Sequence, residues 1–295
     1  MNSTVPSSSS ADDIRHTSPR LLSFMPDWML APTLLWMGVF FFAPLFLMLI
    51  ISFASRGTYG GIEWTLSFAN YRALADTLYL QIYFRSLVFA TITTALCLVL
   101  GFPLAYYIAR APVRWQGVWL ILVMIPFWTN FLVRTYAWVF ILRTEGLLNT
   151  VVMGLGLRQD PIEILYTDAA VLIGLVYGYL PFMVLPLYAA IERLDVSVVE
   201  AAWDLYASGW SVFWRVVLPL VKPGVIAGCL LVFIPSLGAF ITPDLLGGAR
   251  SMMVGNLIQH EYLVIRDWPF GSAIAFVLMG MVMLGVVGYL KVERA

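Results

Sequence analysis

The sequence predicts an all-α integral membrane protein with six transmembrane helices, and two observations lead to this fold class. Of the 295 residues, 61% are hydrophobic and 12% are charged, whereas soluble domains have about 25% charged residues. In addition, six stretches are as apolar and as long as the roughly 20 residues that a helix needs to cross a bilayer. Lipid is therefore the expected solvent for most of the chain.

The six predicted spans account for most of the sequence after residue 32. They cover approximately residues 33–54, 86–109, 117–142, 169–190, 223–246 and 271–291. Several contain proline, which membrane helices tolerate as kinks. We accordingly divide the chain into a tail at 1–32, a first helix with its outer loop at 33–85, and a core of five helices at 86–291.

The tail at 1–32 is rich in serine and carries several charges. Such a segment cannot bury enough apolar surface to offset the entropy lost on ordering. We therefore predict a disordered cytoplasmic tail.

Lys and Arg in the loops predict the orientation. The short loop at 110–116 contains Arg110 and Arg114 and no acidic residue, and short cytoplasmic loops carry an excess of such cations. We therefore expect this loop, the 191–222 loop and both termini to lie in the cytoplasm. Over all loops and tails the count favours this orientation only slightly, by nine cations to seven.

The 191–222 loop contains a predicted amphipathic helix. Ser197 and Glu200 have the spacing of a capping box, which starts a helix. Apolar residues then recur at helical spacing, at Val199, Trp203 and Tyr206. Glu200 and Asp204, four residues apart, lie on the opposite face. Such a helix could lie on the membrane surface or contact another subunit.

The same loop carries a family motif. Glu200-Ala201-Ala202, followed by Val216-x-Leu218-Pro219, resembles the EAA loop of ABC-importer permeases of the MetI-like family. In that family the loop forms a short helix pair that sits in a cleft of the cytoplasmic ATPase and transmits its closure. The resemblance implies an ATPase coupling surface at Glu200, Ala201, Ala202, Asp204 and Gly209.

One position departs from the family pattern. The family usually has glycine where this chain has Tyr206, and a left-handed turn at tyrosine would cost about 1–2 kcal/mol. We therefore expect the bend between the two short helices to move to Ser208-Gly209.

Further motifs resemble the polyamine branch of this family, which transports spermidine and putrescine. They are GFPLAYYIAR at 101–110, IPFWTNFLVRTYAW at 125–138, GLLN at 146–149, GAFITPDLLGG at 238–248 and RDWPFG at 266–271. Many members of this branch have an acidic residue where this chain has Ala239. The resemblance implies a small cationic solute, with another amine such as an opine or an amino acid as the alternative.

Three polar or amphipathic residues follow Pro126 in the middle of the third predicted span, namely Trp128, Thr129 and Asn130. Polar groups in lipid are expensive, so they tend to face a solute path or a neighbouring helix. Both interpretations stay open, and we treat the three as candidate path residues.

Two more path candidates lie near the predicted outer membrane face. Asp244 could attract an amine at the entrance, or it could cap the next segment. Tyr136 could line the path or belong to an ordinary belt of aromatic residues. Arg134, also in the third span, is expected to extend its guanidinium to the outer headgroups.

The sequence argues against chemistry in the chain itself. It has no Walker A pattern for binding nucleotide, and its two histidines show no metal-ligand spacing. No nucleophile with a base is evident in the spans, which disfavours an intramembrane enzyme. A secondary transporter would normally show internal repeats and an ionisable residue deep in a span. We expect no metal and no cofactor.

The resemblance also implies partners. They are a cytoplasmic ABC ATPase dimer that binds the ATP, a second homologous permease and an external solute-binding protein, in a bacterial plasma membrane. A formal net charge of zero gives no reason to expect a nucleic acid partner.

Overall fold

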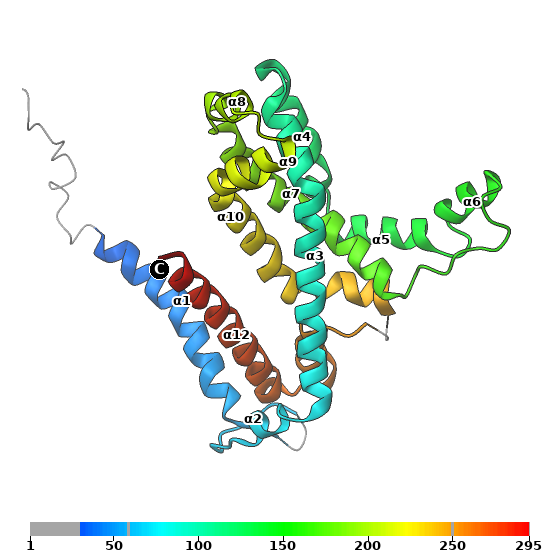
Figure 1. The fold of residues 1–295 in the computed structure, drawn as a ribbon. Coiled ribbons are helices and arrows are strands. Elements are labelled where there is room, and N and C mark those ends of the chain that lie inside the picture. Colours follow the sequence, from blue (N-terminus) through cyan, green and yellow to red (C-terminus); the bar gives the residue numbers. More distant parts are fainter. Residues whose placement is uncertain (1–29, 58–59, 249–250, 295) are drawn as a thin grey trace, which may run out of the picture. The chain divides into compact units, whose positions relative to one another are not determined.

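The fold is described from a computed structural model that covers residues 30–57, 60–248 and 251–294 (Figure 1). The chain forms two compact units, Met1–Ile50 and Ile51–Ala295. The predicted tail lies outside the described residues except for its last three, and the first helix already begins at Ala31.

The first unit contains most of helix α1 (Ala31–Ser52), which confirms the span predicted at 33–54. Its 22 residues include no charged side chain, and Pro44 lies inside it. None of the side chains in its most apolar stretch is buried. A helix of this length and composition is suited to crossing lipid.

The second unit begins with a small hairpin and a short helix. Strand β1 (Ser55–Arg56) pairs antiparallel with β2 (Ile62–Glu63), and α2 (Ala69–Ala73) follows. The Asn70 amide donates to the carbonyls of Ser52 and Ala54, at 3.0 and 2.9 Å. These bonds fix the chain as it leaves α1.

Four long helices form the body of the second unit. They are α3 (Thr77–Arg110), α7 (Asp168–Glu192), α10 (Leu218–Leu237) and α12 (Trp268–Arg294). The spans predicted at 86–109, 169–190 and 271–291 are confirmed by α3, α7 and α12. Helix α3 starts earlier than expected because the Asp76 carboxylate caps it, accepting from the Leu78 backbone N–H at 3.1 Å.

The core lies where α3, α7 and α10 pack together. Cys97, Ile108, Met183, Leu187 and Val221 are all fully buried there. Glycines let the backbones approach: a Cβ on Gly224 would lie only 2.4 Å from the Ala190 Cβ. This is the small-residue packing expected of helices in lipid.

The third predicted span, 117–142, is broken into two helices, and the break follows Pro126. It consists of α4 (Val113–Trp128) and α5 (Phe131–Leu142), and α6 (Leu147–Gly154) follows. The segment Phe131–Gly154, which contains α5 and α6, differs in direction from α4 by 88°. In the described part of the chain, five helices could cross a membrane, and a sixth crossing would use this bent pair.

The fifth predicted span, 223–246, was wrong at both ends. A continuous helix runs from α9 (Gly209–Val212) through the wide turn η3 (Phe213–Val217) into α10, and it stops at Leu237. Gly238 ends it, and Pro243 opens a separate wide turn. Three elements then lead to α12, namely η4 (Pro243–Gly247), α11 (Val254–His260) and η6 (Glu261–Ile265).

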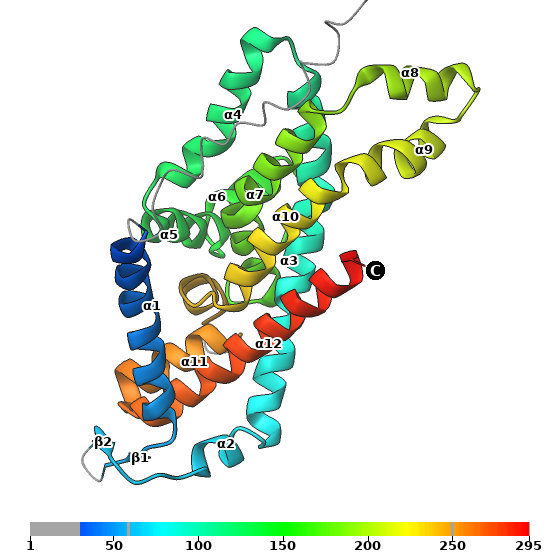
Figure 2. The same cartoon turned by 90° about the vertical axis from the view of Figure 1, so that its left-hand side faces the viewer.

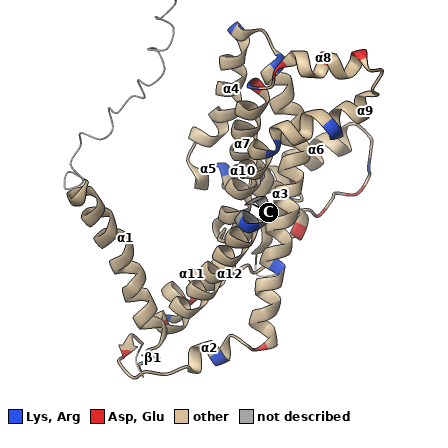
Figure 3. Cartoon of the chain, turned by 60° about the vertical axis from the view of Figure 1, so that its left-hand side comes forward, with Lys and Arg blue, Asp and Glu red and all other residues tan. Residues whose placement is uncertain are grey.

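Within the second unit, α8 (Val196–Asp204) and α9 project beyond the ends of α7 and α10 (Figure 2). The β1–β2 hairpin and α2 lie towards the opposite end of the unit (Figure 2). Figure 3 shows long stretches of α3, α7 and α10 without charged side chains. The two ends of the unit therefore carry the polar segments, as a membrane-spanning bundle requires.

Candidate functional site

The start of α8 differs from the predicted capping box. Asp195 is the N-cap, and its carboxylate accepts from the Ser197 backbone N–H at 3.0 Å. Ser197 and Glu200 therefore do not form the reciprocal pair that the sequence suggested. Hydrogen bonds from the Ser197 backbone and hydroxyl hold the pKa of Asp195 below its usual range.

The end of α8 shows that the bend does not move to Ser208-Gly209. Tyr206 itself adopts the left-handed conformation, with φ of 57°. The Tyr206 N–H donates to the Trp203 carbonyl, and the Ala207 N–H to the Ala202 carbonyl, at 2.9 and 3.2 Å. This is a Schellman motif, which glycine usually closes.

The bend stays at Tyr206 because the residues on either side of it are anchored. Ala202 and Ala207 both pack against the core cluster, so the loop must reverse between them. Ser208 then caps α9, accepting from the Ser211 N–H at 3.3 Å, and Gly209 is the first residue of that helix.

The outward surface of this loop is unusually apolar. Only Val199 and Ala202 of α8 pack against the core. Four large apolar side chains are exposed by 62–97%, namely Trp203, Leu205, Tyr206 and Trp210. Glu200, Ala201 and Asp204 are exposed beside them. We call these seven residues the loop tip, and so large an apolar surface indicates a contact site.

The loop is attached to the bundle through aromatic side chains. The rings of Phe102 on α3 and Phe213 on η3 meet edge to face, with centroids 5.2 Å apart. A groove of about 430 Å³ lies beside them, between α3 and the loop. Displacement of the loop would therefore be felt by α3 as well as by α10.

The break between α4 and α5 brings together three of the five path candidates. The Trp128 side chain is 70% exposed, and the Thr129 hydroxyl donates to the Pro126 carbonyl at 2.7 Å. Asn130 caps α5, accepting from the Leu132 N–H at 2.9 Å. Asn130 thus bonds its own helix and not a neighbouring one.

Arg134 does not extend to the headgroups, and that prediction was wrong. Its side chain is 9% exposed and turns back to donate to the Pro126 carbonyl at 2.8 Å. The guanidinium lies over the rings of Phe131 and Tyr177, at 5.1 and 5.8 Å from their centroids. The break in the chain creates an acceptor for Arg134 that a straight span would not offer.

The other two path candidates lie elsewhere. Tyr136 is half exposed on α5. Asp244 is exposed in the first turn of η4, so it does not stand at the end of a span as the sequence suggested. It does not cap the next segment either, because the N-cap of η4 is Thr242 and no side chain caps that turn.

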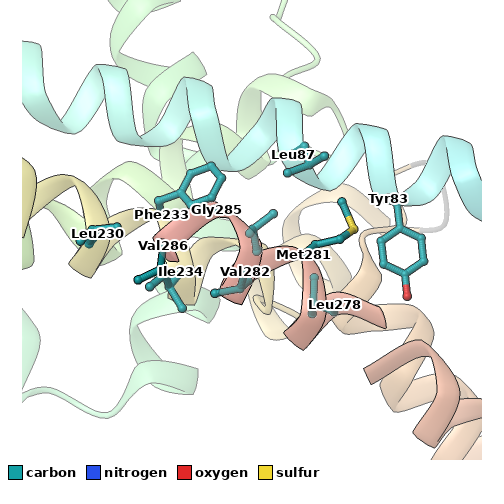
Figure 4. A pocket seen from close by; sticks show the side chains of 11 residues that line it. Tyr83, Leu87, Leu230, Phe233, Ile234, Leu278, Met281, Val282, Gly285 and Val286 are labelled. Carbon is teal, nitrogen blue, oxygen red and sulfur yellow. The ribbon is translucent and has the colours of Figure 1, made fainter. Parts of the chain in front are cut away.

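A cavity of about 240 Å³ lies between α3, α10 and α12 (Figure 4). Its lining is apolar, with Leu230, Phe233 and Met281 among the residues, and the one hydroxyl, on Tyr83, donates to the Ile274 carbonyl. Such a cavity lacks the carboxylates that a cation would need.

The sequence did not reveal two polar ties between distant segments. Asp168 at the start of α7 pairs with Arg85 of α3 and accepts from the Ser251 hydroxyl at 2.7 Å. The buried Asn149 amide bonds the carbonyls of Thr144 and Ile162 at 3.0 and 2.9 Å. The GLLN motif contained this asparagine, but only the fold shows its partners.

Comparison with known proteins places these features in a family. Residues 98–292 match the family described as binding-protein-dependent transport system inner membrane component. A crystal structure of a bacterial ABC transporter that imports the acidic polysaccharide alginate has the same fold, with a TM-score of 0.71. At 16% identity it covers 91% of this chain and 94% of the solved one.

Two curated relatives are more similar in sequence. The spermidine/putrescine transport system permease protein PotB of Escherichia coli (strain K12) is 44% identical over 252 residues, which is 84% of this chain and 92% of PotB. PotB of Haemophilus influenzae is 43% identical over 259 residues, covering 88% and 91%.

Proposed function

Because this chain belongs to the family of binding-protein-dependent transport system inner membrane components, we propose that it forms half of the path by which an importer moves a polyamine. The chain is an inner membrane permease subunit of an ABC importer, a transport component and not an enzyme. Spermidine or putrescine is the proposed solute, since the PotB relatives carry that name at 44% and 43% identity.

One observation supports a second solute class. Ala239, which stands where many polyamine permeases have an acid, is 8% exposed. A Cβ on Gly255 would lie 2.5 Å from the Ala239 carbonyl oxygen, so the backbone at Ala239 packs closely against α11. With one carboxylate fewer, the solute could be an amine with less charge, such as an opine or an amino acid.

We propose that the loop tip is gripped by the cytoplasmic ATPase. The observation that carries this proposal is the exposure of Trp203, Leu205, Tyr206 and Trp210 at the end of a projecting loop. An apolar surface of this size would be costly in water unless a partner covered it. Glu200 and Asp204 would supply charge complementarity to the partner.

The loop is built to transmit force. Asp195 and the Schellman motif fix both ends of α8, and the helix that starts at Gly209 continues without a break to Leu237. Closure of the ATPase would therefore move α10 as a lever and change access to the path. Trp128, Thr129 and Asn130 are the proposed path lining, because the break in the third span leaves their side chains exposed.

We also propose an orientation and a set of partners. Arg110 and Arg114 flank the short connection between α3 and α4, which favours a cytoplasmic position for that connection and for both termini. The remaining partners are a second homologous permease, an external solute-binding protein and an ATPase dimer that binds the ATP. The chain itself needs no cofactor.

The test uses proteoliposomes that contain the complete importer and its binding protein. The wild type should take up radiolabelled putrescine or spermidine in proportion to ATP hydrolysis. The double variant Glu200→Lys, Asp204→Lys should lose most uptake while the chain still inserts. The matched control is Glu63→Lys, a charge reversal on an exposed residue of β2, which should leave coupling unchanged.

The outcomes separate the two parts of the proposal. Unchanged uptake in the double variant would refute the coupling role of the loop tip. Uptake of an amino acid or an opine, with no competition from putrescine, would replace the polyamine by the second solute class.

A further inference from the structure

A carboxylate outside the candidate path has no partner among the residues that the structure describes. Glu261, the first residue of η6, is 6% exposed. The Glu261 carbonyl accepts from the Asp267 N–H at 2.9 Å. A Cβ added to Gly271 would lie 3.4 Å from the Glu261 Cβ. Glu261 is therefore packed against the beginning of α12.

In the part of the chain that the structure describes, the Glu261 carboxylate makes no hydrogen bond and no ion pair. The Arg56 guanidinium acts on it from a distance but is bonded to the Ile265 carbonyl at 2.9 Å. Among the described residues, a fully enclosed side-chain oxygen without a hydrogen-bond partner occurs at Thr93 and not at Glu261. The Glu261 oxygens consequently keep contact with solvent, so the stem is buried and the charged tip is reachable.

Burying most of a charged side chain without a partner is costly, because part of its hydration is lost and not replaced. Burial, with a smaller effect from Asp267, raises the pKa of Glu261 above its usual value. His260 and Arg56 act in the opposite direction. A cation that arrived from outside would relieve this cost.

The surroundings of Glu261 add further negative charge and an aromatic wall. Asp267 caps α12, accepting from the Phe270 N–H at 3.0 Å, and Asp76 caps α3. Both of these carboxylates and Glu261 act electrostatically on the Tyr79 hydroxyl. The Tyr79 ring meets Phe270 edge to face, with centroids 5.1 Å apart.

Carboxylates beside aromatic rings are suited to an alkylammonium group. The carboxylate pairs with the charge, and the rings contact the methylene chain and the cation. Metal ions of comparable charge prefer oxygen ligands alone and gain nothing from the rings. The arrangement therefore favours an organic amine.

We propose that Glu261, together with Asp267 and Tyr79, receives an ammonium group of the solute before it enters the path. This inference rests on the proposed function, because it takes the solute to be an amine and this end of the unit to be external. Glu261 lies in η6, Asp267 directly precedes α12, and Tyr79 lies in the first turn of α3, where its ring contacts Phe270 of α12.

The experiment measures putrescine uptake by the complete importer in proteoliposomes, against the concentration of loaded binding protein. Glu261→Gln should raise the half-saturation concentration about tenfold, as expected for the loss of a charge-assisted contact. Glu261→Asp should lie between it and the wild type. Glu63→Gln, which removes a carboxylate on the exposed β2 strand, is the matched control and should behave as the wild type.

A second readout is the pH dependence of uptake, and its first part uses the wild type alone. Because its pKa is raised, Glu261 should lose its charge at a higher pH than an ordinary carboxylate. For the wild type, the concentration of loaded binding protein that gives half-maximal uptake should therefore rise as the pH falls from neutral. In Glu261→Gln this concentration should depend less on pH.

Each result bears on one hypothesis. Wild-type importer without amine uptake would remove the proposed function. Amine uptake with equal half-saturation for wild type and Glu261→Gln would overturn the ammonium site alone, as would an equal loss in Glu63→Gln. If Glu261→Gln fails to insert, a wild-type half-saturation that does not change with pH overturns the site.

Discussion

The guanidinium of Arg134 donates a hydrogen bond to the carbonyl oxygen of Pro126, 2.8 Å away, across the break between α4 and α5. The last carbonyls of a helix have no partner within it, and lipid offers no water to replace one. Thr129 donates to the same oxygen at 2.7 Å. Arg134 thus satisfies the end of one half-span from within the other.

Substitution of Arg134 should therefore destabilise the bent span. Arg134→Met should cost about 1.5–3 kcal/mol, the worth of a hydrogen bond to a charged group, and Arg134→Lys should cost less. Thermal unfolding of the detergent-purified chain, with uptake in parallel, measures the effect. Arg158→Met, at an exposed loop position, is the control, and equal melting temperatures for the variants at Arg134 and Arg158 would disprove the role.

Tyr206 should be replaceable by glycine with a gain in stability. The side chain is 97% exposed and sits at φ of 57°, so little packing is lost and strain is relieved. Tyr206→Gly should raise the free energy of local unfolding of α8 by about 1 kcal/mol. Amide hydrogen exchange on the purified chain measures this change. Leu205→Gly is the control, since Leu205 has a negative φ of −82° and should lose protection. Faster exchange in Tyr206→Gly would contradict the strain argument.

The cap at Asp195 should make the first turn of α8 sensitive to acid. The pKa of Asp195 in the folded chain is below its usual value, so its stabilising effect is complete above the ordinary aspartate pKa of about 3.9. It is lost as the pH falls through the lowered pKa. Exchange of the Ser197 amide, followed against pH, should show this loss. Asp195→Asn keeps an acceptor and should remove the pH dependence, and a persistent dependence would assign it to another group.

Hydropathy predicted which segments cross the membrane but not where helices bend or stop. The signals for the stops were present in Gly238 and Pro243, and Asn130 is a good N-cap residue, yet an apolar count does not register them. Tyr206 was mispredicted because local preference was overridden by the anchoring of Ala202 and Ala207 in the core.

The candidate coupling residues followed from a continuous motif, which sequence alone can reveal. The environment of Glu261 could not be predicted in the same way. It depends on contacts of η6 with α12 and with the region of Arg56. The Arg56–Ile265 hydrogen bond, for example, joins residues that are 209 positions apart in the sequence. Burial of a carboxylate is a property of the fold and not of its neighbours in the chain.

The close approach of α7 and α10 yields a last prediction. A Cβ on Gly224 would lie 2.4 Å from the Ala190 Cβ and 2.7 Å from the Pro186 carbonyl oxygen, and a backbone carbonyl cannot move aside without shifting α7. Gly224→Ala should therefore cost about 1–3 kcal/mol, the usual penalty for overpacking. Thermal unfolding of the purified chain measures this cost.

Gly280→Ala is the matched control, because nothing lies within 4 Å of a Cβ at that position in α12 and alanine favours a helix by about 1 kcal/mol. It should unfold at the wild-type temperature or slightly above it. Since α7 and α10 lead directly into and out of the α8–α9 loop, Gly224→Ala should also lower uptake per ATP hydrolysed. Equal stability of the two alanine variants would show that α7 and α10 can separate at no cost. That result would contradict the proposal that α10 transmits the movement of the ATPase.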